Sequence, residues 1–485
     1  MLEQIHKIVW GPWLMALFLA AGVFYTVRSH GFQVRGFPVW WGATVGSFFG
    51  KKEGGAGERK AGQEEDRAGE RRAGQEEDRA GERKAGQEGD RAEESAAGGR
   101  RQQFKTACTA LAATVGTGNI VGVATAITCG GPGALFWMWV SAGIGMMTAY
   151  GEVYLGIASR FKDREGNVLC GPFVYLGRLA GKPLLAMAYG ILCLASSLGM
   201  GAMVQANSVA ETLAYAFSFP KIWGAAALTI LIALIIRGGK KQIGSAAEKL
   251  IPFSAGLYIL FSLAVLCLCR RVLPEVLSSI FREAFRLKAA AGGASGYGIS
   301  LALRYGLARG VFSNEAGLGS LAVLHGESPG EDPKLQGMWA MFEVFFDTVI
   351  VCTLTGLVVL CGLKEGGLSA KKAGITGAAL TSWCFSRYLG EWGETLVSLS
   401  LILFAFATII AWHYLGSQAL AWLAGKRLAG LYQMLYLAAV AFGGMASLGN
   451  VWLLADIFNG LMALPNLMAL FLLAGAVAFP EGLDK

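Results

Sequence analysis

Long apolar runs separated by short polar connections make up most of this chain. Eleven such runs can be counted, most of them about 20 residues long, which is enough for an α-helix to cross a bilayer core of about 30 Å. They lie near residues 8–28, 104–128, 133–158, 183–216, 222–236, 250–269, 296–325, 336–362, 393–423, 431–448 and 451–479. The pattern predicts an all-α polytopic membrane protein with about 11 transmembrane helices.

Two of these runs are interrupted by polar, glycine-rich sequence. Val115–Asn119 (VGTGN) breaks the second run, and Phe312–Gly319 (FSNEAGLG) breaks the seventh. An unpaired backbone amide costs several kcal/mol in hydrocarbon, so irregular backbone at that depth is buried in protein or lines a cavity. Interrupted segments at matching positions in two halves of a chain point to the binding site of a secondary transporter.

The order of the runs also predicts internal symmetry. If the first run is set aside, ten remain, and a broken run opens each group of five. Because five is odd, the second group crosses the membrane in the opposite orientation, as in a 5+5 inverted repeat. We expect repeats over 102–270 and 296–485, joined by an amphipathic connection over 271–295. Residues 1–50 would hold the extra N-terminal span and a short amphipathic segment.

Residues 51–101 have a different composition. The 12-residue unit AGERKAGQEEDR begins at Ala56 and recurs, slightly changed, over 68–79 and 80–91. The segment has almost no apolar residue larger than alanine, so it cannot bury a core. Two glycines per unit each cost a helix about 1 kcal/mol relative to alanine. We expect a disordered, solvated linker on the cytoplasmic side, and a protein-docking role stays open.

Basic residues in the short connections favour one orientation. They are Arg160, Lys162, Arg164, Arg178, Lys182, Arg237, Lys240, Lys241, Lys426 and Arg427. With the N-terminus outside, all of them fall in the cytoplasm, as the positive-inside rule prefers. The connections 270–295 and 363–392, then outside, also carry Lys and Arg, which argues the other way. We expect a multi-pass protein of the cell membrane with its C-terminus in the cytoplasm.

Composition excludes several classes of function. The chain is 54% hydrophobic, and its nine cysteines form no CxxC pair. The four histidines include no HExxH motif, and Gly116–Gly118 does not complete a GxGxxG loop. The net charge of +8 is explained by basic residues at the ends of the spans. We therefore expect no catalytic residues, no cofactor and no nucleic-acid partner.

The first break offers groups that bind a small zwitterion and a cation. Unwinding at Gly116–Gly118 would leave free N–H groups, which attract a carboxylate, and free carbonyls, which coordinate a cation. Thr117 and Asn119 add short polar side chains. A plain helix-packing role for Gly118 and Gly122 is the alternative.

In the second break, Ser313 and Asn314 are the candidates to touch a substrate, with Phe312 closing over it. Glu315 is costly to bury at the centre of a membrane helix. It either holds the broken helix in shape or contacts the ligand, and both interpretations stay open.

Further polar residues lie inside apolar runs, and Glu152 and Glu343, near span ends, are expected to be structural. Gln205 is a neutral hydrogen-bonding candidate, and Asp347 is either a cation-coupling residue or a structural anchor. His413 is expected to pack rather than to relay protons. The others are Glu152, Asn207, Glu343, Thr408, Asp456 and Asn459.

Five fragments in the same order resemble the alanine/glycine:cation symporter family. They are TALAATVGTGNI (109–120), GGPGA (130–134), SNEAGLG (313–319), FDTVIVCT (346–353) and DIFNGLMALPNL (456–467). The resemblance covers the chain except 51–101. It implies a LeuT-like inverted-repeat fold of eleven spans that moves alanine or glycine together with sodium across the lipid bilayer.

The resemblance also implies site residues. The amino-acid site would be formed by Thr117, Gly118, Asn119, Gln205, Phe312, Ser313 and Asn314. The sodium ion would lie between Ala113 and Gly116 on one side and Phe404 and Thr408 on the other. Ala407 departs from the family, which often has Ser or Thr there, and Ser417 replaces a usual Glu. A transporter-derived sensor that binds its ligand without moving it is the alternative.

Overall fold

The structure, a computed structural model, describes residues 1–49, 102–163, 165–285, 301–328, 332–368, 375–446 and 448–480. Nearly all of these residues are helical. The expected linker over 51–101 lies outside the described residues. In the N-terminal part, α1 (Leu2–Val9) and α2 (Pro12–Arg28) are followed by α3 (Phe32–Arg35), α4 (Phe37–Ala43) and α5 (Gly46–Phe49).

The first predicted repeat contains helices interrupted by π-helical stretches. They are the helix Gln102–Thr114, η1 (Gly118–Gly122), α7 (Val123–Gly130), α8 (Gly133–Ser159), α9 (Pro172–Arg178), α10 (Pro183–Ser196), η2 (Ser197–Val204), α11 (Gln205–Phe217), α12 (Lys221–Arg237) and α13 (Gly239–Leu268). The two-residue strands β1 (Phe161–Lys162) and β2 (Val168–Leu169) pair antiparallel between α8 and α9. Helix α14 (Leu273–Ala284) then buries one face through Val276, Ile280 and Ala284.

The second predicted repeat also consists of helices, one of them interrupted by a π-helical stretch. It contains α15 (Leu301–Asn314), α16 (Ser320–Leu324), η3 (His325–Glu327), α17 (Pro333–Val344), η4 (Phe345–Cys352), α18 (Thr353–Glu365), α19 (Gly377–Leu389), α20 (Glu391–Ala424), η5 (Lys426–Leu428), α21 (Ala429–Met445), α22 (Leu448–Leu472) and η6 (Ala474–Ala476).

Every predicted apolar run overlaps a helix, so the predicted all-α membrane protein is confirmed. Six described helices are long and apolar enough to cross a membrane: Leu2–Arg28, Pro183–Phe217, Gln242–Leu268, Pro333–Glu365, Glu391–Ala424 and Val451–Leu472. A bent pair, Gln102–Thr114 and Gly118–Gly130, forms a seventh. The total of eleven spans and the inverted repeat stay predictions.

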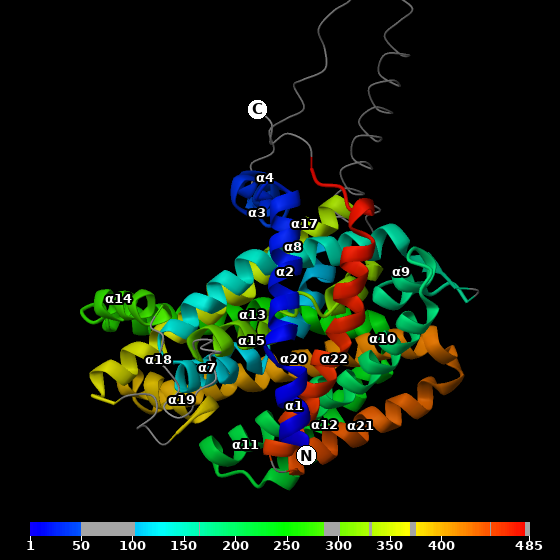
Figure 1. Cartoon of the computed structure of the whole chain (residues 1–485). Coiled ribbons are helices and arrows are strands. Elements are labelled where there is room, and N and C mark those ends of the chain that lie inside the picture. The colour runs from blue at the N-terminus through cyan, green and yellow to red at the C-terminus, as the bar shows by residue number, and fades with distance from the viewer. Residues whose placement is uncertain are drawn as a thin grey trace, which may run out of the picture.

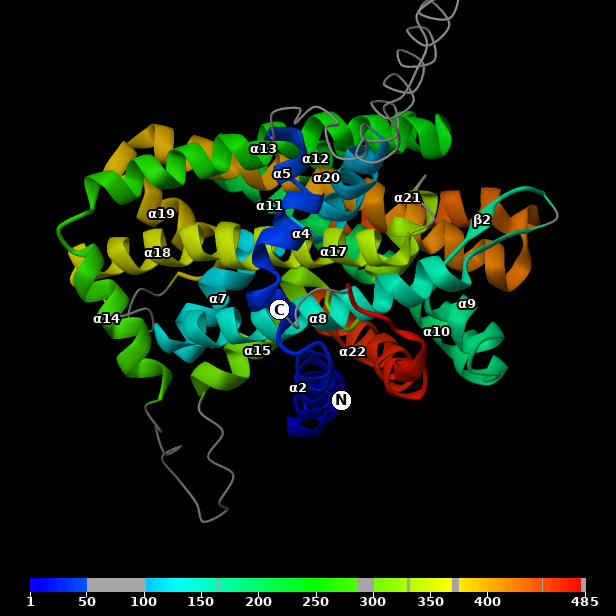
Figure 2. The ribbon, with the colours of Figure 1, turned by 90° about the horizontal axis from the view of Figure 1, so that it is seen from above.

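The long helices run between two ends of the molecule (Figures 1 and 2). One end carries α14 and α19, and the other carries α9 and the β hairpin. At the first end, Lys364 forms an ion pair with Glu275. At the second, Arg160 donates to the carbonyls of Gly326 and Ser328, at 3.0 and 2.7 Å. Each end therefore gathers connections that the predicted topology assigns to one side of the membrane.

Small residues let the central helices approach closely. Helix α8 packs along both α15 and α17. A Cβ on Gly306 of α15 would stand 2.4 Å from the carbonyl oxygen of Ala134 in α8, so only glycine fits there. Helix α2 packs on α8 and α22; it runs upright in Figure 1 and is seen nearly end-on at the edge of the molecule in Figure 2.

Candidate functional site

The first break is a sharp bend closed by one side chain. The axes of the two halves of this span are bent by 47° relative to each other. Val115 and Gly116 leave the helix, and the Gly116 N–H donates to Asn119 Oδ1 at 2.9 Å. Gly118 already belongs to the π-helix η1. The irregular backbone is therefore shorter than the predicted Gly116–Gly118 segment and begins one residue earlier, because Asn119 caps it.

The second break lies slightly later than predicted. Phe312, Ser313 and Asn314 form the last turn of α15, and the irregular backbone is Glu315–Gly319. Glu315 has φ +57°, a left-handed conformation that is uncommon for a residue with a side chain. Gly317 (φ +94°) and Gly319 (φ +81°) share it at no steric cost.

The two breaks touch each other. A Cβ on Gly118 would stand 3.3 Å from Ser313 Cα and 3.4 Å from Phe312 Cδ1. A Cβ on Gly116 would stand 2.7 Å from Thr408 Oγ1 and 3.7 Å from Gln205 Oε1. Three elements that are far apart in sequence, α11, α15 and α20, therefore meet at the backbone of the first break.

Two polar atoms at this meeting point lack partners among the described residues. Thr117 Oγ1 and Gln205 Oε1 are buried without a hydrogen bond, and the two residues are 0% and 1% exposed. Gln205 Nε2, by contrast, donates to the Met200 carbonyl at 3.3 Å. A buried polar atom without a partner costs about 1–3 kcal/mol, and a bound ligand can remove that cost.

Asn119 and Asn314 use their polar atoms to hold the breaks together. Asn119 Nδ2 donates to Asp347 Oδ1 at 2.6 Å and to the Asp347 carbonyl at 3.2 Å. Asn314 Nδ2 donates to Thr348 Oγ1 at 3.1 Å, and its Oδ1 accepts the Ala316 N–H at 3.1 Å. Asp347 and Thr348 both lie in η4, so this π-helical stretch connects the two breaks.

The predicted cation residues lie on the other side of the first break. Thr408 Oγ1 donates to the Phe404 carbonyl at 3.0 Å, within α20. Ala113 is 3% exposed and lies in the last turn of the helix Gln102–Thr114, just before Gly116. Thr408 and Gly116 are in close contact, as noted above. Ala407 is 0% exposed and contributes no hydroxyl.

The second break is held by side chains from four other helices. Glu315 Oε1 accepts from Trp412 Nε1 at 3.0 Å and its Oε2 from Ser320 Oγ at 2.6 Å. Asn466 Nδ2 donates to the Gly317 carbonyl at 2.9 Å and to Glu152 Oε1 at 2.6 Å, and Tyr189 donates to the Leu318 carbonyl at 3.0 Å. These contacts favour the structural interpretation of Glu315.

Sequence reasoning missed the residues that cover Phe312. Its ring stacks on Trp452 of α22 with centroids 5.6 Å apart. The Arg309 guanidinium lies 5.3 Å from the Phe312 ring centroid and 3.7 Å from Asp456 Oδ2. Arg309 and Trp452 also line a cavity of about 660 Å³. No motif signals this group, because its members come from two separate runs and meet only in the folded chain.

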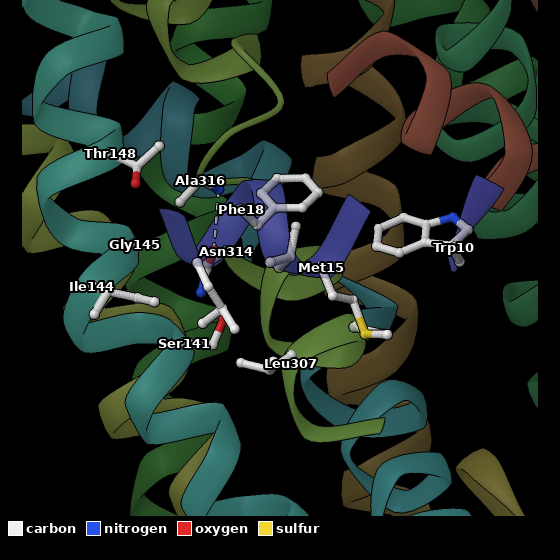
Figure 3. A pocket seen from close by; sticks show the side chains of 13 residues that line it. Trp10, Met15, Phe18, Ser141, Ile144, Gly145, Thr148, Leu307, Asn314 and Ala316 are labelled. Carbon is white, nitrogen blue, oxygen red and sulfur yellow. Dashed lines mark hydrogen bonds between the residues drawn. The ribbon is translucent and has the colours of Figure 1, made fainter. Parts of the chain in front are cut away.

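The N-terminal helices cover the back of the second break. Figure 3 shows Met15 and Phe18 of α2 beside Asn314 and Ala316, with Ser141 of α8 in the same pocket. A Cβ on Gly317 would stand 2.4 Å from Phe18 Cε1. The extra N-terminal span therefore packs directly on the irregular backbone of Glu315–Gly319.

His413, predicted to pack, lies away from the breaks. Its ring stacks on Tyr432 with centroids 5.4 Å apart and meets the edge of Tyr436 at 5.0 Å.

Comparison with known proteins agrees with this architecture. The chain is 35% identical to the sodium/alanine symporter AgcS of Methanococcus maripaludis, over 98% of this chain and 95% of that protein. It is 36% identical to an uncharacterized transporter of Haemophilus influenzae, over 97% and 92% of the two chains. The fold is similar to that of MhsT in complex with L-phenylalanine, with a TM-score of 0.54 and 16% identity over 75% of this chain and 88% of that one.

A family model matches most of the chain as well. Residues 86–480 match the model of the sodium:alanine symporter family, and this region contains both breaks. The chain therefore belongs to the sodium:alanine symporter family.

Proposed function

We propose that this protein is a secondary active transporter that carries small neutral amino acids, alanine and glycine, together with sodium. The observation that carries the proposal is the pair of unpartnered oxygens, Thr117 Oγ1 and Gln205 Oε1, where the two breaks meet. The relative from Methanococcus maripaludis that is named a sodium/alanine symporter supports alanine and sodium as the transported pair.

Coupling to a cation is what makes uphill transport of such a substrate possible. A zwitterion has no net charge, so the membrane potential cannot concentrate it. One positive charge that crosses 100 mV is worth about 2.3 kcal/mol, which supports roughly 50-fold accumulation. In the proposal, Ala113 and Gly116 coordinate this sodium ion from the first break, and Phe404 and Thr408 coordinate it from α20.

The amino acid would lie between the first break and the last turn of α15. Thr117, Gly118, Asn119 and Gln205 would face it from one side, and Phe312, Ser313 and Asn314 from the other. The size of the substrate side chain sets the selectivity. Phe312 is 3% exposed and stacks on Trp452, and even a single Cβ added to Gly118 would stand within van der Waals distance of Ser313. A side chain larger than methyl would displace this packing.

Transport would proceed by alternating access, with the N-terminus outside the cell and the C-terminus in the cytoplasm. The second break is tied to α10, α16, α20 and α22 by the hydrogen bonds described above, and Asn466 of α22 is bonded in turn to Glu152 of α8. In the first break, Asn119 accepts the Gly116 N–H and donates to Asp347 of η4. We therefore assign the larger movement to the first broken span.

Uptake of labelled alanine into proteoliposomes, with and without an inward sodium gradient, tests the proposal. We expect sodium-dependent accumulation above equilibrium that glycine inhibits and leucine does not. Binding of alanine without uptake in any cation gradient would contradict the transporter and favour a sensor. A catalytic role would be indicated only if the labelled alanine were chemically altered.

A further inference from the structure

A cavity of about 350 Å³ lies where α20 turns into α21, and none of its lining residues belongs to either break. The end of α20, the beginnings of α21 and α13, and Asn167 of the β hairpin form its wall. Figure 2 shows α21 and β2 at the same end of the molecule. The predicted topology places the turns α12–α13 and α20–α21 in the cytoplasm. The proposed function gives this cavity no role.

One buried side chain that lines the cavity lacks partners. His413 is 8% exposed, and neither of its ring nitrogens has a hydrogen-bond partner among the described residues. Its ring stacks on Tyr432, in the first turn of α21, with centroids 5.4 Å apart. A neutral imidazole offers one N–H donor and one acceptor nitrogen at the edge of the ring. Buried polar atoms of this kind are normally satisfied, so the cavity suits a ligand that carries oxygen atoms and hydroxyl groups.

Two helix N-termini meet at the same cavity. Helix α13, of 30 residues, begins at Gly239, and α21, of 17 residues, begins at Ala429; both residues line the cavity. No side chain caps either N-terminus. The free N–H groups of a first helical turn and the positive end of the helix dipole attract an anion, such as a phosphate group. The ligand is therefore expected to be negatively charged at this end.

The sequence around the cavity has the complementary charge. Gly239 and Gly425 both line it, and five basic residues lie within two positions of one or the other. They are Arg237, Lys240, Lys241, Lys426 and Arg427. No Asp or Glu occurs over 212–247 or 395–455. Basic residues clustered on the cytoplasmic side of membrane helices are typical of sites for anionic lipid headgroups.

The helices beside the cavity present apolar side chains to the outside. Helices α12 and α21 pack on each other, and five of their large apolar residues are between 48 and 64% exposed. They are Leu231, Leu234, Leu431, Met434 and Leu435. Acyl chains can cover such a surface, and a free phosphate ion cannot. This difference favours a lipid over a soluble anion.

We propose that the cavity binds the headgroup of an anionic phospholipid from the cytoplasmic leaflet. The phosphate lies at the N-termini of α13 and α21, and the His413 ring hydrogen-bonds to ester or hydroxyl oxygens next to it. The acyl chains lie along α12 and α21. The bound lipid holds the α12–α13 turn against the α20–α21 turn. The inference goes beyond the proposed function and does not depend on which substrate is carried.

Native mass spectrometry of the full chain in detergent, titrated with phosphatidylglycerol, tests the proposal. We expect a saturable complex with one tightly bound lipid. Phosphatidylcholine, whose headgroup has no net charge, should bind at least about tenfold more weakly. Inorganic phosphate, added in excess, should not displace the lipid.

Two variants locate the site. His413→Phe keeps an aromatic ring against Tyr432 and removes both unpartnered nitrogens. It should weaken phosphatidylglycerol binding about tenfold, while the melting temperature without lipid is unchanged or higher. The double variant Arg237→Gln with Arg427→Gln changes only exposed side chains, so it should fold normally, and it should weaken binding at least about tenfold.

The matched control is Lys162→Gln with Lys182→Gln. It removes the same charge from exposed positions that the predicted topology also places in the cytoplasm, and neither residue lines the cavity. It should leave phosphatidylglycerol binding unchanged. Equal losses in this control and in the Arg237 and Arg427 variant would mean that only the overall charge matters, and would overturn the site.

Other outcomes would also overturn the proposal. They are equal binding of phosphatidylglycerol and phosphatidylcholine, and unchanged phosphatidylglycerol binding in His413→Phe. Displacement of the lipid by inorganic phosphate would replace the lipid with a soluble anion. None of these results bears on sodium-dependent alanine uptake, so the proposed function stands or falls by its own test.

Discussion

The two breaks look alike in sequence but differ in how their polar groups are satisfied. In the second break, the Gly317 and Leu318 carbonyls and both Glu315 oxygens accept hydrogen bonds from side chains of other elements. In the first break, one asparagine caps the backbone, and Thr117 Oγ1 and the nearby Gln205 Oε1 are left without partners. An interrupted helix can thus be either a rigid support or an open site.

The difference follows from what surrounds each break. The second break is enclosed by α2, α8, α10, α20 and α22, which supply Phe18, Glu152, Tyr189, Trp412 and Asn466. The first break faces α15, α20 and the start of α11, where small groups and a neutral amide meet it. In the proposed function, the second break therefore supports the site and the first break binds the ligand.

The largest expected effect comes from removing a support of the second break. Asn466→Ala would remove the hydrogen bonds that Asn466 makes with the Gly317 carbonyl, Glu152 Oε1 and the Tyr175 hydroxyl. At about 1–3 kcal/mol for each buried group, we expect a loss of at least about 3 kcal/mol of stability. Thermal unfolding in detergent measures it.

Asn459→Ala is the matched control, since Asn459 lies on the same helix, is 1% exposed and has an unpartnered Oδ1. It should lower the melting temperature much less. Equal losses in the two variants would mean that the hydrogen bonds of Asn466 do not hold the second break.

A smaller but specific effect is expected at the cation side of the first break. In Gly116→Ala, the new Cβ would stand 2.7 Å from Thr408 Oγ1 and push that hydroxyl away. We expect the sodium concentration for half-maximal uptake to rise at least about tenfold, which corresponds to about 1.4 kcal/mol. Gly143→Ala, where no heavy atom lies within 4 Å of the added methyl, should leave sodium dependence unchanged.

The substrate side of the same break is expected to respond to bulk. In Gly118→Ala, the new methyl would stand 3.3 Å from Ser313 Cα, tight enough that the wall of α15 must give by a few tenths of an ångström. We expect alanine uptake to fall more than glycine uptake, so that the ratio of alanine uptake to glycine uptake drops several fold. Competition assays between the two amino acids measure this ratio. Gly122→Ala is the control, because the nearest heavy atom to its added methyl lies 4.0 Å away.

The smallest effect is expected outside both breaks. Deletion of residues 53–94 removes most of the charged repeat and should leave the uptake rate and sodium dependence unchanged within about twofold, because a solvated linker buries nothing. Loss of uptake with normal membrane insertion would instead give this segment a functional contact.

The sequence predicts the apolar runs and both breaks because these depend on local composition. Asn119 and Asn314 could be singled out because polar side chains inside an apolar run are costly unless they are hydrogen-bonded. Their partners could not be predicted. Asp347 lies 228 residues from Asn119, and Glu152 lies 314 residues from Asn466.

The limits of the irregular backbone were also beyond the sequence. The π-helical stretches η1, η2 and η4 lie inside apolar runs, where hydrophobic periodicity does not separate them from α-helix. Asn119 decides where the first helix stops by accepting the Gly116 N–H. The Arg309, Phe312 and Trp452 group depends on contacts between α15 and α22, which only the tertiary fold creates.

The most direct test of the difference between the breaks is the alanine affinity of Thr117→Val, measured beside its melting temperature. Valine has nearly the shape of threonine and removes only the unpartnered hydroxyl. We predict an unchanged or higher melting temperature and at least about tenfold weaker sodium-dependent alanine binding, restored in Thr117→Ser. Unchanged alanine affinity in Thr117→Val would contradict the assignment of the first break as the ligand-binding one.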